Sequence, residues 1–166
     1  MNNIVLIGMM GSGKTTIGKA LATQLNYGYI DTDHVIEETQ GLSIAKIFEV
    51  EGESKFRMME ANVIQRIAHL SQKVIATGGG IVLYPTNTLT LKKMGKIFYL
   101  RGTVETLLSH LEGEMDQRPL LREQQMATIL KVRSGLYENT ANDIIDIDYK
   151  SVPEIVEEII KRYDFN

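Results

Sequence analysis

The sequence of 166 residues contains no cysteine, so it forms neither a disulfide nor a zinc site built on thiolates. It has no apolar run near the ~18 residues that a membrane-spanning helix needs. A broad basic surface for a nucleic-acid backbone is also missing, because the formal net charge is −3. These absences predict a cytoplasmic protein that binds neither membranes nor nucleic acid.

The length indicates one domain. About 150 residues is a usual domain size, and such a domain buries roughly 70% of the surface of its unfolded chain. No repeat, low-complexity tract or linker divides the sequence. The first expected strand begins at residue 4, which leaves no room for a signal peptide. We therefore predict a single domain over residues 1–166, and we expect it to be a monomer.

Strand-like and helix-like segments alternate along the chain. The expected strands are 4–7, 27–31, 73–77, 96–100 and 143–147, and the expected helices include 85–94 and about 122–137. The stretch from 34 to about 70 is too long for a simple crossover, and we interpret 33–61 as a substrate-binding helical segment. The alternation predicts an α/β fold, with a parallel five-stranded sheet and helices on both faces.

The most informative motif is Gly8-Met9-Met10-Gly11-Ser12-Gly13-Lys14-Thr15, which matches the phosphate-binding P-loop pattern G-x-x-x-x-G-K-[ST]. Because it joins an expected strand to an expected helix, it directs backbone N–H groups and the positive end of the helix dipole at an anion. Lys14 can reach the outer phosphates of a nucleotide, and the Thr15 hydroxyl can bind Mg²⁺. The residues expected to bind the nucleotide are Gly11, Ser12, Gly13, Lys14, Thr15 and Thr16.

Two aspartates, Asp31 and Asp33, follow the second expected strand and point the same way if the segment is extended. Phosphoryl transfer needs a carboxylate near Mg²⁺ and a group that accepts or orients the proton of the nucleophile. One aspartate could serve each purpose. Alternatively, Asp33 only caps the helix that follows it.

Two further features allow a structural and a functional interpretation. Arg57 and Glu60, three apart on one helix face, form either a solvated ion pair or an arginine held by Glu60 for an anionic substrate. The glycine run 78–80 is either a flexible linker or a turn against which a ligand lies closely.

A lid is expected at about 112–124, where the sequence is polar and non-periodic before the next helix. Within it, Arg118 precedes Pro119, which stiffens the loop. An arginine on a closing loop would neutralise charge that develops during phosphoryl transfer. Alternatively, Arg118 is an exposed residue that balances nearby acids. Arg133, on the next helix, is by itself typical of a surface residue.

Together these motifs resemble the shikimate kinase family. The resemblance spans nearly the whole chain and rests on 8–16, Asp31-Thr32-Asp33 with Ile36-Glu37, Phe56-Arg57 with Glu60, Gly78-Gly79-Gly80, Arg118-Pro119-Leu120-Leu121, and Arg133 with Tyr137. The P-loop is shared by many proteins, whereas the combination is highly specific. It implies a fold like that of nucleoside monophosphate kinases. It also implies transfer of the ATP γ-phosphoryl group to the 3-hydroxyl of shikimate, in aromatic amino-acid biosynthesis.

The resemblance also implies residue roles on the substrate side. Asp33 would contact the shikimate hydroxyls and assist deprotonation. Arg57 and Arg133 would hold the shikimate carboxylate through charge-assisted hydrogen bonds. Gly79 and Gly80 would lie against the ring.

On the nucleotide side, the resemblance implies that Thr15 is a direct ligand of Mg²⁺ and that Asp31 holds it through water. Lys14 and Arg118 would neutralise the phosphates of ATP. The chain departs from the family pattern before the lid, where relatives commonly carry an arginine or lysine that packs on adenine. His110 either stacks on the base or is an exposed helix residue, and 148–153 is another candidate for the adenine pocket.

Two other functions stay open. A gluconate or nucleoside monophosphate kinase would share the P-loop and differ in the acceptor pocket. A nucleotide-gated switch that binds guanine would usually carry D-x-x-G and N-K-x-D, and neither string occurs in the sequence.

Overall fold

The computed structural model describes residues 2–111 and 119–163, without the side chains of 119–121. The strands are β1 (Ile4–Ile7), β2 (Gly28–Asp31), β3 (Lys73–Ala76), β4 (Lys96–Arg101) and β5 (Asp143–Asp146). The helices are α1 (Lys14–Leu25), α2 (Thr32–Gln40), α3 (Ile44–Ile67), α4 (Pro85–Met94), α5 (Val104–His110), α6 (Pro119–Thr140) and α7 (Val152–Arg162), with a 3₁₀ turn η1 (Ile81–Leu83). Every expected strand is present, with ends that differ by at most one residue.

The five strands form one parallel sheet in the order β2-β3-β1-β4-β5. The central strand β1 pairs with β3 on one side and β4 on the other. All four residues of β1 are fully buried, which explains why its sequence is continuously apolar rather than alternating. The order brings the carboxyl ends of β2, β3 and β1 side by side, and ligands of parallel sheets bind beyond those ends.

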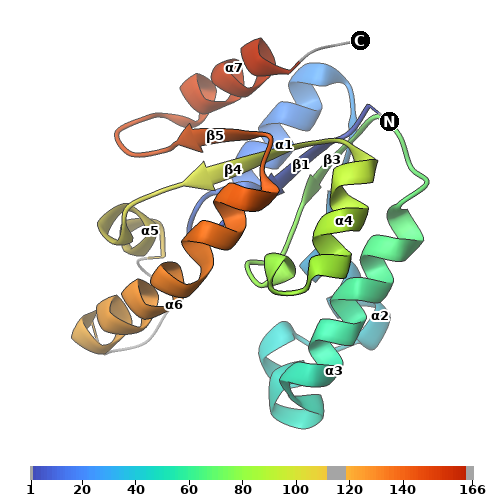
Figure 1. Ribbon diagram of the computed structural model, residues 1–166, viewed down its shortest axis with the longest axis vertical. Coiled ribbons are helices and arrows are strands. Elements are labelled where there is room, and N and C mark those ends of the chain that lie inside the picture. The colour runs from blue at the N-terminus through green and yellow to red at the C-terminus, as the bar shows by residue number, and fades with distance from the viewer. Residues whose placement is uncertain (1, 112–118, 164–166) are drawn as a thin grey trace.

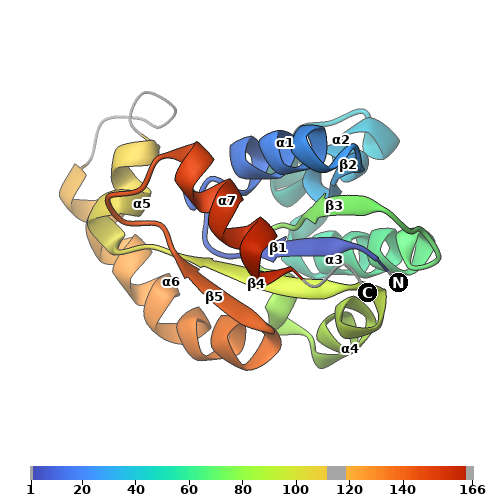
Figure 2. The same ribbon diagram turned by 90° about the horizontal axis from the view of Figure 1, so that it is seen from above.

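Helices cover both faces of the sheet, which confirms the predicted layers. Figure 2 shows α1 and α7 on one face and α3, α4 and α6 on the other. Helices α1, α4, α6 and α7 contact the strands directly, and the two helices of the first face also contact one another. None of the helices in the described ranges has the length and apolarity needed to cross a bilayer.

Helices α2 and α3 lie together beyond the sheet, at the bottom of Figure 1, and α2 contacts β2. Helix α3 is broken at Gly52, whose φ of 81° and ψ of 169° are not helical. The break separates the two apolar stripes that the sequence shows, one around Ile47 and one around Ile64. The hydrogen bond from the Ile44 backbone N–H to Glu37 ties the start of α3 to α2, and α3 packs against α2 and α4.

Candidate active site

A cavity of about 900 Å³ lies at the carboxyl ends of β1, β2 and β3. Its walls come from the P-loop, α2, α3, the glycine turn after β3, the end of α5, the middle of α6 and the segment from β5 into α7. The predicted residues of the described region that line it are Gly11, Ser12, Gly13, Lys14, Thr15, Thr16, Asp31, Asp33, Arg57, Gly79, Gly80, His110 and Arg133. Arg118 lies outside the described residues. The predicted lid at 112–124 is described only from 119 onward, where the backbone already belongs to α6.

The P-loop wraps the N-terminus of α1. Gly13 precedes the helix with a φ of 85°, and Gly8 has a φ of 149° with only 2.7 Å between an added Cβ and the Leu100 carbonyl oxygen. Both positions therefore require glycine. The first backbone N–H groups of α1 have no acceptor within the helix, and they lie beside the cavity. The loop is thus built to bind an anion.

Lys14 is held at the centre of this loop. Its ammonium donates hydrogen bonds to the carbonyl oxygens of Gly8 at 2.7 Å and Met9 at 2.8 Å, and to Ser12 Oγ at 3.2 Å. Burial lowers the pKa of Lys14 to about 8, although the negative charges of Asp33 and Asp31 oppose the shift. The ammonium is therefore still mostly charged at neutral pH. Because burial has removed water from around it, a bound anion would stabilise its charge.

The two aspartates have different structural roles. Asp31 caps α2, because its Oδ1 accepts hydrogen bonds from the backbone N–H groups of Asp33 at 3.0 Å and His34 at 3.3 Å. Its Oδ2 accepts from the Thr15 hydroxyl at 3.1 Å and the Tyr29 hydroxyl at 3.3 Å. The interpretation of Asp33 as the helix cap is therefore wrong, and the Asp33 side chain is available to the cavity.

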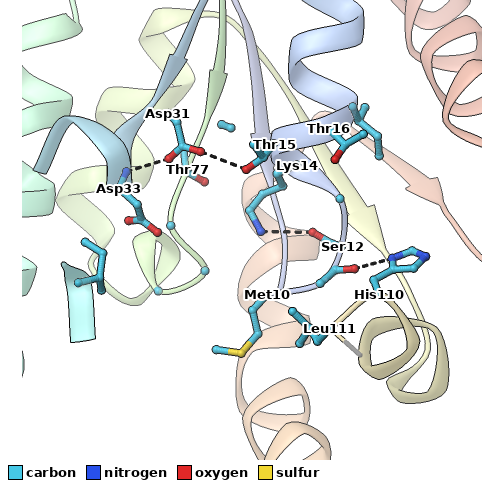
Figure 3. Close-up of a pocket in the computed structure, with 18 of the residues that line it drawn as sticks. Met10, Ser12, Lys14, Thr15, Thr16, Asp31, Asp33, Thr77, His110 and Leu111 are labelled. Atoms are coloured by element: carbon cyan, nitrogen blue, oxygen red, sulfur yellow. Dashed lines mark hydrogen bonds between the residues drawn. The ribbon is translucent and has the colours of Figure 1, made fainter. Parts of the chain in front are cut away.

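The Asp33 carboxylate faces the Lys14 ammonium from the opposite wall of the cavity (Figure 3). Its Oδ1 is buried and has no hydrogen-bond partner among the described residues. Burial, followed by the neighbouring charges of Asp31 and Glu60, raises the pKa of Asp33 to about 6, against the opposing effect of Lys14. A carboxylate with a pKa near 6 is mostly ionised at neutral pH and can accept a proton.

Thr15 and Asp31 fit a magnesium ion that arrives with a nucleotide. The Thr15 hydroxyl and the Asp31 carboxylate already lie within 3.1 Å of each other beside the P-loop. No cluster of three or more His, Cys, Asp or Glu ligands exists within the described ranges. Mg²⁺ does not need such a cluster, because it usually binds one or two protein oxygens together with phosphates and water.

Arg57 and Glu60 form a buried ion pair rather than a solvated one. Arg57 Nη1 lies 2.6 Å from Glu60 Oε2, and the side chains are 8% and 0% exposed. The guanidinium also lies 5.3 Å from the Phe56 ring centre and 5.9 Å from that of Phe48. Burial raises the pKa of Glu60, although the charge of Arg57 opposes the shift. Arg57 Nε and Glu60 Oε1 are buried without a partner in the described part of the chain.

The glycine turn packs directly on these charged side chains. A Cβ at Gly78 would lie 2.7 Å from both Asp33 Oδ1 and Glu60 Oε1, and a Cβ at Gly80 would collide with the Arg57 guanidinium. The linker interpretation is therefore wrong. The need for glycine at 78 and 80 already follows from contacts within the protein, whereas the prediction that 79 and 80 lie against a ring stays a prediction.

Arg133 reaches the cavity from α6 and is not the isolated surface residue that its periodicity favours. Arg133 Nη1 would lie 3.5 Å from a Cβ at Gly79. One turn further along α6, the buried Tyr137 donates its hydroxyl to the Gly79 carbonyl oxygen at 2.5 Å and stacks on Tyr99, with ring centres 4.9 Å apart. These contacts fix α6 against the glycine turn and so position Arg133.

Residues from α5 and from the segment after β5 also line the cavity, and the sequence identified them only in part. His110 and Leu111 line it from the end of α5, and Ile147, Lys150 and Val152 line it from the segment after β5. The range 148–153 was one of the two adenine candidates, and it does lie at the cavity. His110 was the other, and its Nδ1 lies 2.7 Å from the Gly11 carbonyl oxygen. No sequence signal predicts that contact, because the two residues are 99 positions apart.

The comparisons with known proteins agree with this geometry. The model of the shikimate kinase family matches residues 10–164. The chain belongs to the shikimate kinase family. A shikimate kinase from Caldanaerobacter subterraneus subsp. tengcongensis is 42% identical over 167 residues, which cover 98% of this chain and 96% of that protein. These matches confirm the resemblance that the sequence motifs indicated.

Solved structures of shikimate kinases share the fold. The shikimate kinase from Acinetobacter baumannii, solved in complex with shikimate, aligns with a TM-score of 0.90 and 36% identity over 98% of this chain and 92% of that chain. A gluconokinase from Sinorhizobium meliloti aligns with a TM-score of 0.63 and 19% identity, which shows a common fold alone. The predicted fold class is therefore confirmed.

Proposed function

We propose that this chain transfers the γ-phosphoryl group of ATP to the 3-hydroxyl of shikimate, giving shikimate 3-phosphate and ADP, in chorismate and aromatic amino-acid biosynthesis. Its family supports the class of reaction. The observation that carries the proposal is the set of three buried polar atoms without partners among the described residues, in side chains that line one cavity: Asp33 Oδ1, Glu60 Oε1 and Arg57 Nε.

The chemistry of these three atoms favours a small hydroxylated acid. Two carboxylate oxygens need donors, which substrate hydroxyl groups supply, and Arg57 Nε needs an acceptor, which a substrate carboxylate supplies. A buried polar atom that stays unpaired costs about 1–3 kcal/mol. A ligand with hydroxyls and a carboxylate recovers that free energy on binding, and shikimate has both groups.

The proposed reaction uses Asp33 as the proton acceptor. The substrate hydroxyl loses its proton to the Asp33 carboxylate while its oxygen forms a bond to the γ-phosphorus. The bond between that phosphorus and the oxygen shared with ADP breaks, and ADP leaves with the electron pair. Lys14 and the N-terminus of α1 balance the negative charge of the phosphates, and Arg118 is proposed to add its charge from the lid.

The remaining assignments are proposed from the same arrangement. Arg57 and Arg133 hold the shikimate carboxylate, and Gly79 and Gly80 adjoin the ring. Thr15 binds Mg²⁺ directly and Asp31 binds it through water. Magnesium at this place would neutralise phosphate charge.

An assay of phosphorylation with three acceptors offered separately tests the proposal. Shikimate, gluconate and AMP are each incubated with ATP and Mg²⁺, and ADP release is measured. We expect turnover with shikimate alone, and Lys14→Ala should abolish it. Turnover of gluconate or AMP without turnover of shikimate would contradict the proposal. Binding of guanine nucleotides without any turnover would favour a switch.

The chain is further proposed to act as a monomeric, single-domain enzyme in the cytoplasm. Sedimentation equilibrium with ATP and shikimate present measures the oligomeric state, and a dimer would contradict this part of the proposal. It leaves the assignment of the reaction untouched.

A further inference from the structure

The end of α5 contacts the P-loop through a side chain and through the backbone. His110 Nδ1 lies 2.7 Å from the Gly11 carbonyl oxygen, as the dashed line in Figure 3 shows. A carbonyl oxygen only accepts hydrogen bonds, so Nδ1 carries the proton and donates it. His110 lies in the last turn of α5, immediately before the residues that lead into the predicted lid.

Close packing brings His110 within reach of the loop. Gly11 has a φ of 79°, and a Cβ at this position would collide with the Leu107 carbonyl oxygen of α5. The same Cβ would lie 3.1 Å from the Leu111 side chain. This corner of the P-loop therefore rests on α5 with no space between them.

The hydrogen bond from His110 fixes one peptide unit of the P-loop from both sides. The carbonyl oxygen of Gly11 accepts from His110, and the N–H of the same peptide, on Ser12, donates to the Met9 carbonyl oxygen at 3.2 Å. A rotation of this peptide plane would break both bonds. The next residue, Gly13, begins the turn that aims the first N–H groups of α1 at the cavity.

The other end of α5 is fixed as well. Thr103, which caps α5, donates its backbone N–H and its hydroxyl to Asp148 Oδ1, at 3.1 and 2.9 Å. Asp148 follows β5 and lies just before Lys150, which lines the cavity. Helix α5 thus cannot shift along its axis without breaking contacts at one end, so His110 has a defined position.

We propose that His110 is a positioning residue for phosphate binding, because its donated hydrogen bond holds the Gly11–Ser12 peptide in the orientation that the anion-binding loop needs. The inference rests on the proposed function in that the anion is the phosphate chain of the nucleotide. If the His110 ring instead stacked on adenine, His110 would affect only ligands that carry a base. The hydrogen bond to Gly11 should also affect the binding of phosphate ligands that have no base.

Three substitutions separate the hydrogen bond from the ring. Asparagine carries an N–H donor on Cγ, at the place of His Nδ1, but has no ring, so His110→Asn keeps the bond. Phenylalanine has the ring without the donor, so His110→Phe keeps only the stacking surface. His110→Ala has neither. The control is His69→Ala, since His69 is exposed and precedes β3 at the opposite edge of the sheet.

The measurement is the affinity for ADP and for inorganic tripolyphosphate, by calorimetry and by competition against ATP. The Ala and Phe variants should weaken both ligands by about threefold to tenfold, the loss of one net hydrogen bond, while the Asn variant and the control stay within about twofold of the unmodified chain. The KM for ATP should rise by the same factor, with kcat and the KM for shikimate nearly unchanged.

Either of two results would overturn the inference. One is a Phe variant that binds ADP as well as the unmodified chain, and the other is an Ala variant that loses affinity for ADP but not for tripolyphosphate. An unmodified chain that binds neither ligand would instead contradict the proposed function, so the two failures are distinguishable. Thermal unfolding of all four variants shows whether any loss of affinity comes from a loss of folded protein.

Discussion

Buried polar side chains differ between the two ends of the parallel strands. We call the side of the sheet where the strands begin the amino edge, and the side where they end, at the cavity, the carboxyl edge. At the amino edge, Asn3 is fully buried, and its amide group donates to the carbonyl oxygens of Leu70 at 2.7 Å and Met94 at 2.9 Å. Its Oδ1 accepts from the Lys73 backbone N–H at 2.9 Å. One side chain therefore ties together the chain segments around β1, β3 and β4, with its hydrogen-bonding groups paired.

At the carboxyl edge, buried polar side chains keep atoms without partners. Asp33, Arg57 and Glu60 each have one such atom among the described residues. An unpaired buried polar atom is destabilising, whereas a paired one is close to neutral or stabilising. The amino edge thus supports the fold, while the carboxyl edge gives up stability to keep groups ready for a ligand. Substitutions at the two edges should separate stability from activity.

The largest effect is expected for Asp33→Asn, which keeps the shape of the side chain and removes the proton acceptor. The kcat should fall by about 10²–10⁴, the usual contribution of a general base, with little change in the affinity for ATP. Steady-state kinetics with shikimate and ADP titrations measure both. The control is Glu38→Gln, an exposed carboxylate on the same helix. A collapse of ATP affinity would instead make Asp33 a metal-binding or structural residue.

A smaller effect on a different constant is expected for Arg133→Ala. Loss of one charged partner of the substrate carboxylate should raise the KM for shikimate by about 10- to 100-fold, with kcat much less affected. The matched control is Lys131→Ala, an exposed cation two positions earlier on α6. If the KM does not change, Arg133 does not touch the substrate.

For Asn3→Ala at the amino edge we expect a loss of stability without a loss of activity. Removal of the side chain takes away the Asn3 partner of three backbone groups, one in a buried and two in partly buried hydrogen bonds, and should lower the free energy of unfolding by about 2–4 kcal/mol. Below the unfolding transition, kcat and both KM values should stay as they are. Urea denaturation measures the stability, and Asn2→Ala at the exposed neighbouring position is the control. Unchanged stability would show that the paired side chain of Asn3 does not support the fold.

The smallest effect is a pH-dependent gain in stability for Asp33→Asn. Asp33 binds its proton more tightly in the folded chain, where its pKa is about 6, than in the unfolded chain, where an aspartate has a pKa of 3.8. Its ionisation therefore lowers stability as the pH rises from about 4 to 6, and the penalty stays constant above that range. The variant lacks the penalty, so it should be more stable by about 2 kcal/mol at pH 8.

The stability difference should vanish below pH 4. Urea denaturation of both chains at pH 8 and pH 3.5 gives the comparison. If the gain is equal at the two pH values, its cause is packing rather than the charge of Asp33.

The sequence predicts local features of the site well. The P-loop is a continuous motif, and the strand and helix on its two sides have clear periodicity, so the anion site and Lys14 follow directly. The parallel sheet also follows, since helices alternate with strands. The choice between Asp31 and Asp33 as helix cap needed the structure, because both residue types and positions suit an N-cap.

Features that depend on distant contacts were not predictable. The burial of Arg57 and Glu60 depends on the glycine turn, which follows them by about twenty positions. The sequence predicted that a ligand lies close to the glycines, and that stays a prediction. The structure shows that side chains of the protein itself, Arg57, Asp33 and Glu60, approach Gly78 and Gly80. The contact of His110 with Gly11 depends on the order of strands in the sheet, which no local pattern contains.

The most direct test of the account is a crystal structure of the chain with ADP and shikimate both bound. We expect shikimate to lie in the cavity at the carboxyl ends of the strands. Its hydroxyls should lie within hydrogen-bond distance of Asp33 Oδ1 and Glu60 Oε1, and its carboxylate should lie at Arg57 and Arg133. Shikimate bound away from this cavity, or bound there while the three buried atoms still lack partners, would contradict the account.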